Sequence, residues 1–265
     1  MSEAFVHSYD CMPLLLETDT ILSTTNKMYF QKGKIPMYRV EDKFSCCERD
    51  LVLLQSRLKS VLQPDKNQIH DNGYKITSVY FDDLYDTHLQ DTEDGNRLRE
   101  KYRIRIYNDS FETIKLEVKY KKDSRVFKKA KKITVSQMKQ LLAGQCIADE
   151  HPSTDNTITL FNLAISNRGL RPKVIVEYDR AAYVFEAGNV RITLDRNLRA
   201  STDFEAFANN NQAHYNSIPG FDRVLEVKYD EFLPGFIARI LETGNMNQTS
   251  YSKYRLCREL KGGIN

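Results

Sequence analysis

The stretch REKYRIRIY, residues 99–107, alternates charged and apolar side chains. Because residues two apart in a β-strand share a face, this stretch predicts a strand with one cationic and one apolar face. The apolar face carries Tyr102, Ile104 and Ile106, a pattern typical of a strand that packs on a core. The opposite face is cationic and carries Arg97, Arg99, Lys101, Arg103 and Arg105.

The same period of two continues on both sides of this strand. Turn-forming DGN (94–96) and NDS (108–110) flank it, as expected between antiparallel strands. The sequence therefore predicts about eight strands in one α+β domain built on a large antiparallel sheet or barrel. The other alternating segments are residues 38–44, ITSVYFDD (76–83), IKLEVKY (114–120), RVFKKAKKI (125–133), PKVIVEYDR (172–180), AAYVFEAG (181–188), NVRITLDR (189–196) and RVLEVKY (223–229).

Helices are predicted between groups of strands. Ser45 and Glu48 have the spacing of a capping box and begin the first predicted helix. One face of that helix carries Leu51, Leu54, Leu58, Val61 and Leu62. Further helices are expected at 134–143, at 157–169, from Pro234 and at 252–260. Residues 1–36, closed by Pro36, show no period and predict an N-terminal arm before a domain at 37–265.

Composition excludes several classes of protein. The 265 residues include 41% hydrophobic and 28% charged side chains, which excludes a collagen-like or largely disordered chain. No stretch approaches the roughly 20 apolar residues that cross a bilayer, so we expect no membrane insertion. The five cysteines lack C-x-x-C spacing, which favours a reduced, cytoplasmic compartment over a disulfide framework or zinc site. His70, His88 and His151 lack metal-ligand spacing and predict surface or packing roles.

Positive charge is concentrated in the central strands. Residues 97–132 hold 14 Lys and Arg against 5 Asp and Glu, a local charge of +9 in a chain of net charge +3. One interpretation is an ordinary solvated sheet face. The other is a polyanion site, because like charges on one face repel unless a ligand neutralises them. Carboxylates between these cations suit a divalent metal held among phosphate-binding groups. These mixed faces are Arg39, Glu41 and Lys43; Lys115, Glu117, Lys119 and Lys121; and Glu226 and Lys228.

Short motifs in a fixed order resemble a known family. They are YRVEDKF (38–44), SVYFD (78–82), RxKxRxRxY (99–107), LEVK (116–119), EYxR (177–180), VRITLD (190–195), LEVK (225–228) and SKY (252–254). This set, spanning about residues 37–257, resembles the VTC domain, the polyphosphate polymerase domain of vacuolar transporter chaperones and of stand-alone bacterial relatives. That family belongs to the CYTH-like triphosphate tunnel metalloenzyme superfamily.

The resemblance implies an eight-stranded antiparallel β-barrel tunnel with peripheral helices. It implies that Glu226 binds Mn²⁺ or Mg²⁺, with Glu41 or Glu117 as helpers. It further implies transfer of the ATP γ-phosphoryl group onto inorganic polyphosphate, with triphosphate or pyrophosphate as related ligands. The phosphate-binding residues that it implies are Lys43, Arg103, Arg105, Lys119, Arg180, Lys228 and Lys253. Further candidates are Arg39, Arg99, Lys101, Lys128 and Ser252. In the basic run at 125–133 the strand register is open, so Lys129 is an alternative to Lys128.

Two other functions stay open. Tunnel hydrolases begin with Glu-x-Glu-x-Lys, whereas the first of these positions is Arg39 here, which disfavours but does not exclude a tripolyphosphate or nucleoside triphosphate hydrolase. A noncatalytic polyphosphate-binding module is the second alternative. No nucleic-acid partner is expected, because the basic run lacks interleaved aromatic residues. The sequence contains no P-loop motif and no dinucleotide-binding glycine motif. It does not indicate which proteins this chain binds.

Overall fold

The computed structural model describes residues 39–68, 73–122, 125–150, 155–211, 213–218, 223–244 and 246–259. All of them belong to one compact unit, Tyr38–Asn265. The predicted arm at 1–36 lies outside the described residues, as do His70 and His151.

The described chain alternates between runs of strands and helices. Its helices are α2 (Glu48–Val61), α3 (Thr87–Glu93), α4 (Val135–Leu142), α5 (Thr157–Arg168), α6 (Phe204–Ala208), α7 (Gly235–Leu241) and α8 (Lys253–Glu259), with a 3-10 turn at Ala187–Asn189. Its strands are β1 (Val40–Ser45), β2 (Gln63–Pro64), β3 (Tyr74–Asp82), β4 (Leu98–Tyr107), β5 (Ser110–Lys122), β6 (Arg125–Ile133), β7 (Arg171–Phe185), β8 (Val190–Ser201), β9 (Asn216–Ser217), β10 (Val224–Tyr229) and β11 (Asn247–Gln248).

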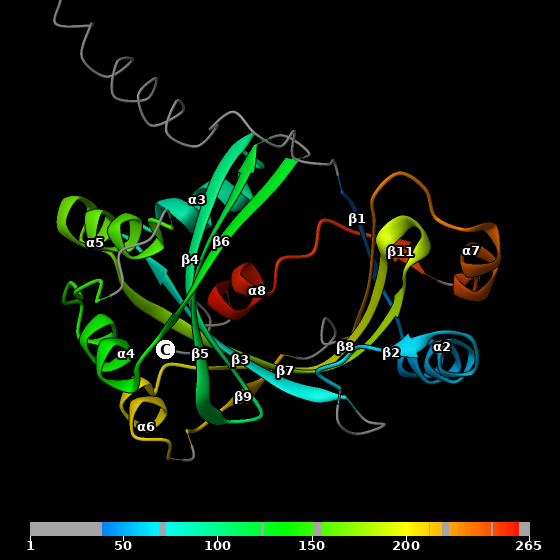
Figure 1. The fold of residues 1–265 in the computed structure, drawn as a ribbon, viewed down its shortest axis with the longest axis horizontal. Coiled ribbons are helices and arrows are strands. Elements are labelled where there is room, and N and C mark those ends of the chain that lie inside the picture. The colour runs from blue at the N-terminus through cyan, green and yellow to red at the C-terminus, as the bar shows by residue number, and fades with distance from the viewer. Residues whose placement is uncertain are drawn as a thin grey trace, which may run out of the picture. The chain divides into compact units, whose positions relative to one another are not determined.

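The strands form one antiparallel 11-stranded sheet in the order β11-β1-β10-β8-β7-β3-β4-β5-β6, with β2 paired to β7 and β9 to β8. The sheet curves around α8, which lies on its concave side (Figure 1). The predicted α+β fold with an antiparallel sheet and peripheral helices is therefore confirmed. The predicted closed eight-stranded barrel is wrong, because β6 and β11 end the sheet without pairing to each other. Across the opening, Lys119 Nζ of β5 lies 3.8 Å from Glu41 Oε2 of β1, so a side-chain contact spans the two halves.

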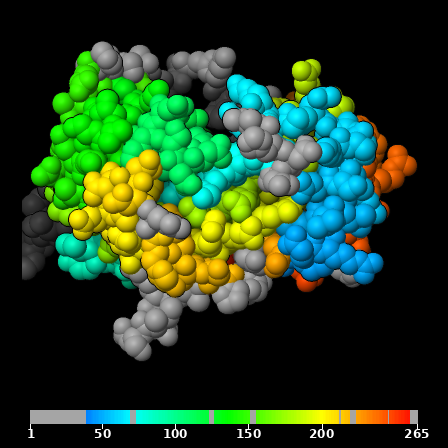
Figure 2. Space-filling model, turned by 90° about the horizontal axis from the view of Figure 1, so that it is seen from below, coloured from blue at the N-terminus to red at the C-terminus, as the bar shows by residue number. Residues whose placement is uncertain are grey.

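Helices cover the convex face in two groups. On one half, Met138 and Leu141 of α4 and Phe161 of α5 pack in one buried cluster with Ile104 of β4. On the other half, α2 and α7 pack on β8 and β10, with Leu54 and Ile237 fully buried. Figure 2 shows this face, with side chains of β3, β7 and β8 visible between the two helix groups. On the concave side, Tyr80 of β3 and Val176 of β7 pack in a third buried cluster with Tyr254 of α8. The charged faces of β4 and β5 lie beside this cluster, inside the curve.

Several predicted boundaries shift. The segments at 172–180 and 181–188 form one strand, β7, which continues through a bulge near Asp179 instead of turning. The capping box of α2 is Cys47 with Asp50, not Ser45 with Glu48, because Asp50 Oδ2 accepts the Cys47 N–H at 3.1 Å.

Three further differences are small. Val61, the last residue of α2, is 50% exposed. Arg97 precedes β4 instead of lying on its cationic face. The sequence did not predict α3 and α6, which are only 7 and 5 residues long.

Candidate functional site

The concave side of the sheet holds a cavity of about 530 Å³. Strands β1, β4, β5, β7 and β10 contribute to its lining, together with the segment that leads into α8. Eleven of its lining side chains are cations: Arg39, Lys43, Arg99, Lys101, Arg103, Arg105, Lys119, Lys121, Arg180, Lys228 and Lys253. Among the described lining residues, Glu41 and Glu226 are the carboxylates. Such an excess of positive charge in a concave site favours a polyanionic ligand.

The cavity brings together most of the predicted site residues, including Ser252. Glu117 and Lys128 are not in its lining. Glu117 is buried behind it, with Oε1 accepting from Lys128 Nζ at 3.1 Å and Oε2 accepting from Arg103 Nε at 2.6 Å. Since both oxygens of Glu117 are already paired, its predicted role as a metal ligand stays a prediction without geometric support.

Arg103 is held in a fixed orientation. Its Nη2 lies 2.6 Å from Glu117 Oε2, and its Nη1 donates to the Tyr80 hydroxyl at 3.0 Å. Neighbouring Arg105 donates through Nε to Ser78 Oγ at 3.2 Å. Burial alone would raise the pKa of Glu117, but Arg103, Arg105 and Lys128 lower it, so the carboxylate stays charged. A guanidinium oriented in this way loses little freedom when it binds an anion.

Glu41 and Glu226 form an acidic pair at one side of the cavity. Lys43 Nζ lies 3.0 Å from Glu41 and 3.6 Å from Glu226, and Lys228 Nζ lies 3.6 Å and 2.9 Å from the same two carboxylates. Burial would raise the pKa of Glu226, but Lys228, Lys43 and Arg180 hold it well below its ordinary value. Against the effect of burial, Lys119, Lys43 and Lys228 also lower the pKa of Glu41, so both carboxylates are anionic, and both are shared by Lys43 and Lys228.

This pair fits a divalent cation that also binds phosphate. No cluster of three or more His, Cys, Asp or Glu side chains is found within the part of the chain that the structure describes. Mg²⁺ is usually held by one or two carboxylates together with substrate phosphates, so a third protein ligand is not required. Glu41 and Glu226 supply hard oxygen donors that are brought together by their shared contacts with Lys43 and Lys228. The donor set therefore fits Mg²⁺ or Mn²⁺.

Asp195 is a site residue that the sequence did not predict. Its carboxylate accepts from Arg180 Nε at 2.6 Å and Arg180 Nη2 at 2.7 Å, and from Lys253 Nζ at 2.6 Å. Burial would raise the pKa of Asp195, but Arg180 and Lys253 lower it. Asp195 thus fixes two cavity cations from different elements. The sequence signal that could have identified Asp195 is the alternation in β8, which puts Thr193 and Asp195 on the face opposite Ile192 and Leu194.

Four cavity lysines have a lowered pKa: Lys101, Lys119, Lys121 and Lys228. Burial and the nearby charges of Lys119 and Lys43 lower the pKa of Lys101 to about 7. Burial also lowers the pKa of Lys119, to about 8, although Glu41 opposes this shift. The cavity therefore concentrates more positive charge than its own carboxylates neutralise, and a bound polyanion would relieve that repulsion.

Arg39 lies at the cavity just before β1 begins. Its Nη2 donates to the Asn189 carbonyl at 2.8 Å, and its Nε lies 3.7 Å from Asp230. These contacts orient the guanidinium from the strand that carries Glu41 and Lys43.

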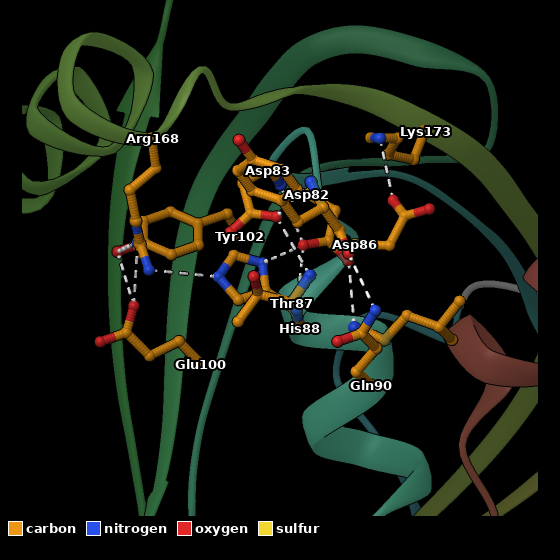
Figure 3. Close-up of polar contacts among 12 residues, drawn as sticks. Asp82, Asp83, Asp86, Thr87, His88, Gln90, Glu100, Tyr102, Arg168 and Lys173 are labelled. Carbon is orange, nitrogen blue, oxygen red and sulfur yellow. Dashed lines mark hydrogen bonds and ion pairs between the residues drawn. The ribbon is translucent and has the colours of Figure 1, made fainter.

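A second polar network joins α8 to β3 and to the start of α3. Figure 3 shows the part of it that runs from Asp82 through His88 to Arg168. Asp82 Oδ2 accepts from the Tyr254 hydroxyl of α8 at 2.5 Å, and its Oδ1 lies 3.1 Å from His88 Nδ1. On the other side of His88, Nε2 lies 3.5 Å from Arg168, which can only donate. Burial would raise the pKa of Asp82, but contacts with His88 and Tyr254 lower it to about 2. The buried His88 therefore has the packing role that the sequence allowed.

These features define an α+β protein with a cation-lined cavity inside a curved antiparallel sheet. The model of the VTC domain family matches residues 38–260, so the chain belongs to that family. The predicted resemblance is confirmed, and membership supports an activity related to triphosphates or polyphosphate. Among the described helices, none combines the length and apolar character needed to cross a membrane.

The solved structures that match this chain have low sequence identity and TM-scores below 0.5. The PH1819 protein from Pyrococcus horikoshii OT3 is 14% identical at a TM-score of 0.47, covering 85% of this chain and 99% of its own. A conserved hypothetical protein from Pyrococcus furiosus is 12% identical at a TM-score of 0.36, with 77% and 85% covered. The Mimivirus capping enzyme triphosphatase is 12% identical at a TM-score of 0.31, with 85% and 95% covered. A search among curated proteins gave no match. The family assignment therefore rests on the VTC domain match.

Proposed function

We propose that this chain is a metal-dependent polyphosphate polymerase that transfers the γ-phosphoryl group of ATP to the end of a polyphosphate chain. The observation that carries the proposal is the cavity itself, in which eleven cations surround one pair of carboxylates. A chain of phosphates carries negative charge along its whole length, so it matches cations supplied from several strands better than a small monoanion does. VTC membership supports the same substrate class.

The reaction needs positioning and charge neutralisation more than a protein nucleophile. The attacking terminal phosphate is already anionic, and the transferred group must lie in line between it and the leaving ADP. Arg103 and Arg180, each held by a buried carboxylate, would bind equatorial phosphoryl oxygens through their rigid forks. Lys43, Lys228 and Lys253 would add point charges.

Glu226 and Glu41 would hold the metal. When bound, Mg²⁺ or Mn²⁺ supplies a Lewis acid for phosphoryl oxygens. Lys43 and Lys228 each lie within 3.6 Å of both carboxylates, so they would neutralise phosphate oxygens bound beside the pair. We assign Glu117 to orienting Arg103 and not to the metal, because its oxygens are already paired.

The products formed from ATP test this proposal. Purified protein incubated with ATP and either Mn²⁺ or Mg²⁺ should give ADP and a polymer that an exopolyphosphatase degrades. Orthophosphate in equal amount to ADP, without polymer, would instead identify a hydrolase. Binding of tripolyphosphate without turnover under either metal would identify a binding module.

A further inference from the structure

Ser252 caps the N-terminus of α8 and also lines the cavity. It lies directly before α8, and its Oγ accepts the Arg255 N–H at 3.3 Å, as an N-cap does. The same oxygen also contacts Lys101 Nζ of β4 at 3.0 Å, and Ser252 lines the phosphate cavity. An N-cap needs only one lone pair of the hydroxyl, so that role does not account for the lysine or for the position in the cavity.

Lys101 is suited to accept a proton from this hydroxyl. Cations face it from three strands: Arg99 and Arg103 on its own strand β4, Lys119 on β5 and Lys43 on β1. On the α8 side it faces the Tyr254 ring, whose centroid lies 5.4 Å from Nζ. Burial and these charges lower the pKa of Lys101 to about 7, so a substantial fraction of the amine is neutral near neutral pH. A neutral amine has a lone pair that can accept the hydroxyl proton, whereas an ammonium group can only donate.

We infer that Ser252 is a phosphoacceptor: with no phosphate chain in the cavity, its hydroxyl takes the γ-phosphoryl group of ATP, and Lys101 is the base. In this step Ser252 Oγ bonds to the γ-phosphorus, the bond from that phosphorus to the bridging oxygen of ADP breaks, and the hydroxyl proton passes to Lys101 Nζ. ADP leaves, and phosphoserine remains. The inference rests on the proposed function, because it requires that the cavity bind ATP.

The surroundings of Ser252 stabilise such a product. A phosphoserine carries nearly two negative charges and three acceptor oxygens. Lys101 becomes protonated in the step and remains beside it, and Lys253 follows directly in the chain. The new phosphoryl group would also lie in the cavity where the next γ-phosphoryl group is delivered, so phosphoserine could serve as the first acceptor of a growing chain.

The test measures covalent phosphate on the protein. The full chain is incubated with γ-labelled ATP and Mn²⁺, denatured and washed, and the phosphorylated peptide is sequenced by mass spectrometry. In parallel, pyrophosphate is supplied as an acceptor and polymer is measured. We expect phosphoserine at Ser252 in the wild type, with labelling that rises from about pH 6 to about pH 8 as Lys101 loses its proton.

Matched variants separate the roles of the hydroxyl and the amine. Ser252→Asn keeps an oxygen that can cap α8 but has no hydroxyl, so it should fold and carry no label. Ser60→Ala removes an exposed hydroxyl of α2 that lies outside the cavity lining, and it should keep the label. Lys101→Arg keeps the charge but cannot act as a base, so labelling should fall about a hundredfold or more and lose its rise with pH.

Each result decides a different question. Polymer from pyrophosphate without phosphoserine would overturn this inference and leave the polymerase proposal standing. Label at another residue, or label that persists in Ser252→Asn, would also overturn it. Phosphoserine at Ser252 without polymer would support the inference and contradict the polymerase proposal. Neither label nor polymer would contradict both.

Discussion

Changing Asp195 to Asn should destabilise the folded protein, and bound tripolyphosphate should reverse part of that loss of stability. The carboxylate is 1% exposed and is the shared partner of Arg180 and Lys253. Asn would remove this counter-charge from both cations and would leave Arg180 only the more distant Glu226, at 3.6 Å. Removing one partner of a buried ion pair costs about 3–5 kcal/mol. Asn still accepts one hydrogen bond, so we expect about 3 kcal/mol. In a domain of this size that lowers Tm by about 10 °C.

Tripolyphosphate should restore part of this stability. Its negative charge would replace that of Asp195 beside Arg180 and Lys253, so saturating tripolyphosphate should raise Tm more in Asp195→Asn than in the wild type. Turnover should fall, because Arg180 is no longer held in one orientation. Thermal unfolding followed by circular dichroism, with and without tripolyphosphate, measures both effects.

Asp179→Asn is the matched control. Asp179 lies on β7 next to Arg180, but its carboxylate accepts from Asn197 at an exposed site, so the change should cost within about 0.5 kcal/mol. If the two variants unfold at the same temperature, Asp195 does not carry the ion pairs described. If tripolyphosphate stabilises Asp195→Asn no more than the wild type, Arg180 and Lys253 do not bind phosphate.

Three further changes test other parts of the site. Glu226→Gln removes a charge from the acidic pair while keeping its shape, so turnover should collapse while tripolyphosphate binding, measured by calorimetry, largely persists. Arg39→Glu should abolish polymer synthesis and raise the ratio of orthophosphate to polymer formed from ATP, because it exchanges a phosphate-binding cation for a carboxylate that can orient water. Asp82→Asn should lower stability by about 2 kcal/mol at neutral pH, as measured by urea unfolding.

The pH dependence of the last variant has a defined sign. The pKa of Asp82 is lower in the folded protein than its ordinary value of 3.8, so its stabilisation is present above about pH 4 and is lost as pH falls to about 2. The stability difference between wild type and Asp82→Asn should disappear over that range, and a constant difference would refute the assignment.

Full turnover of Glu226→Gln at ordinary metal concentration would show that Glu226 is not the main metal ligand. Parental polymer synthesis by Arg39→Glu would show that Arg39 does not contact the reacting phosphates.

Strand alternation predicted most of the cavity, because side-chain parity is a local property. Arg99, Lys101, Arg103 and Arg105 share a face whatever strand lies beside them, and the structure places all four at the cavity. Contacts between strands depend on register, which alternation does not supply. Arg103 lies directly opposite Glu117 in the β4–β5 ladder, so Glu117 pairs with that arginine behind the cavity.

The alternation of side chains along each strand also could not predict whether the sheet closes into a barrel. The alternation of β1 and β6 indicates strands but does not indicate whether the edges of the sheet meet. Likewise, the pairing of Asp195 with both Arg180 and Lys253 requires β7, β8 and α8 to meet in space. The order of short motifs identified the family, while the geometry of these contacts needed the structure.

The most direct test of the account is the fate of the γ-phosphoryl group of ATP. Full-length protein, γ-labelled ATP and Mn²⁺ or Mg²⁺ are incubated with pyrophosphate, and the products are separated by gel electrophoresis. We expect a ladder of labelled polymer that is sensitive to exopolyphosphatase and accumulates together with ADP. Labelled orthophosphate without any polymer, under both metals, would contradict it.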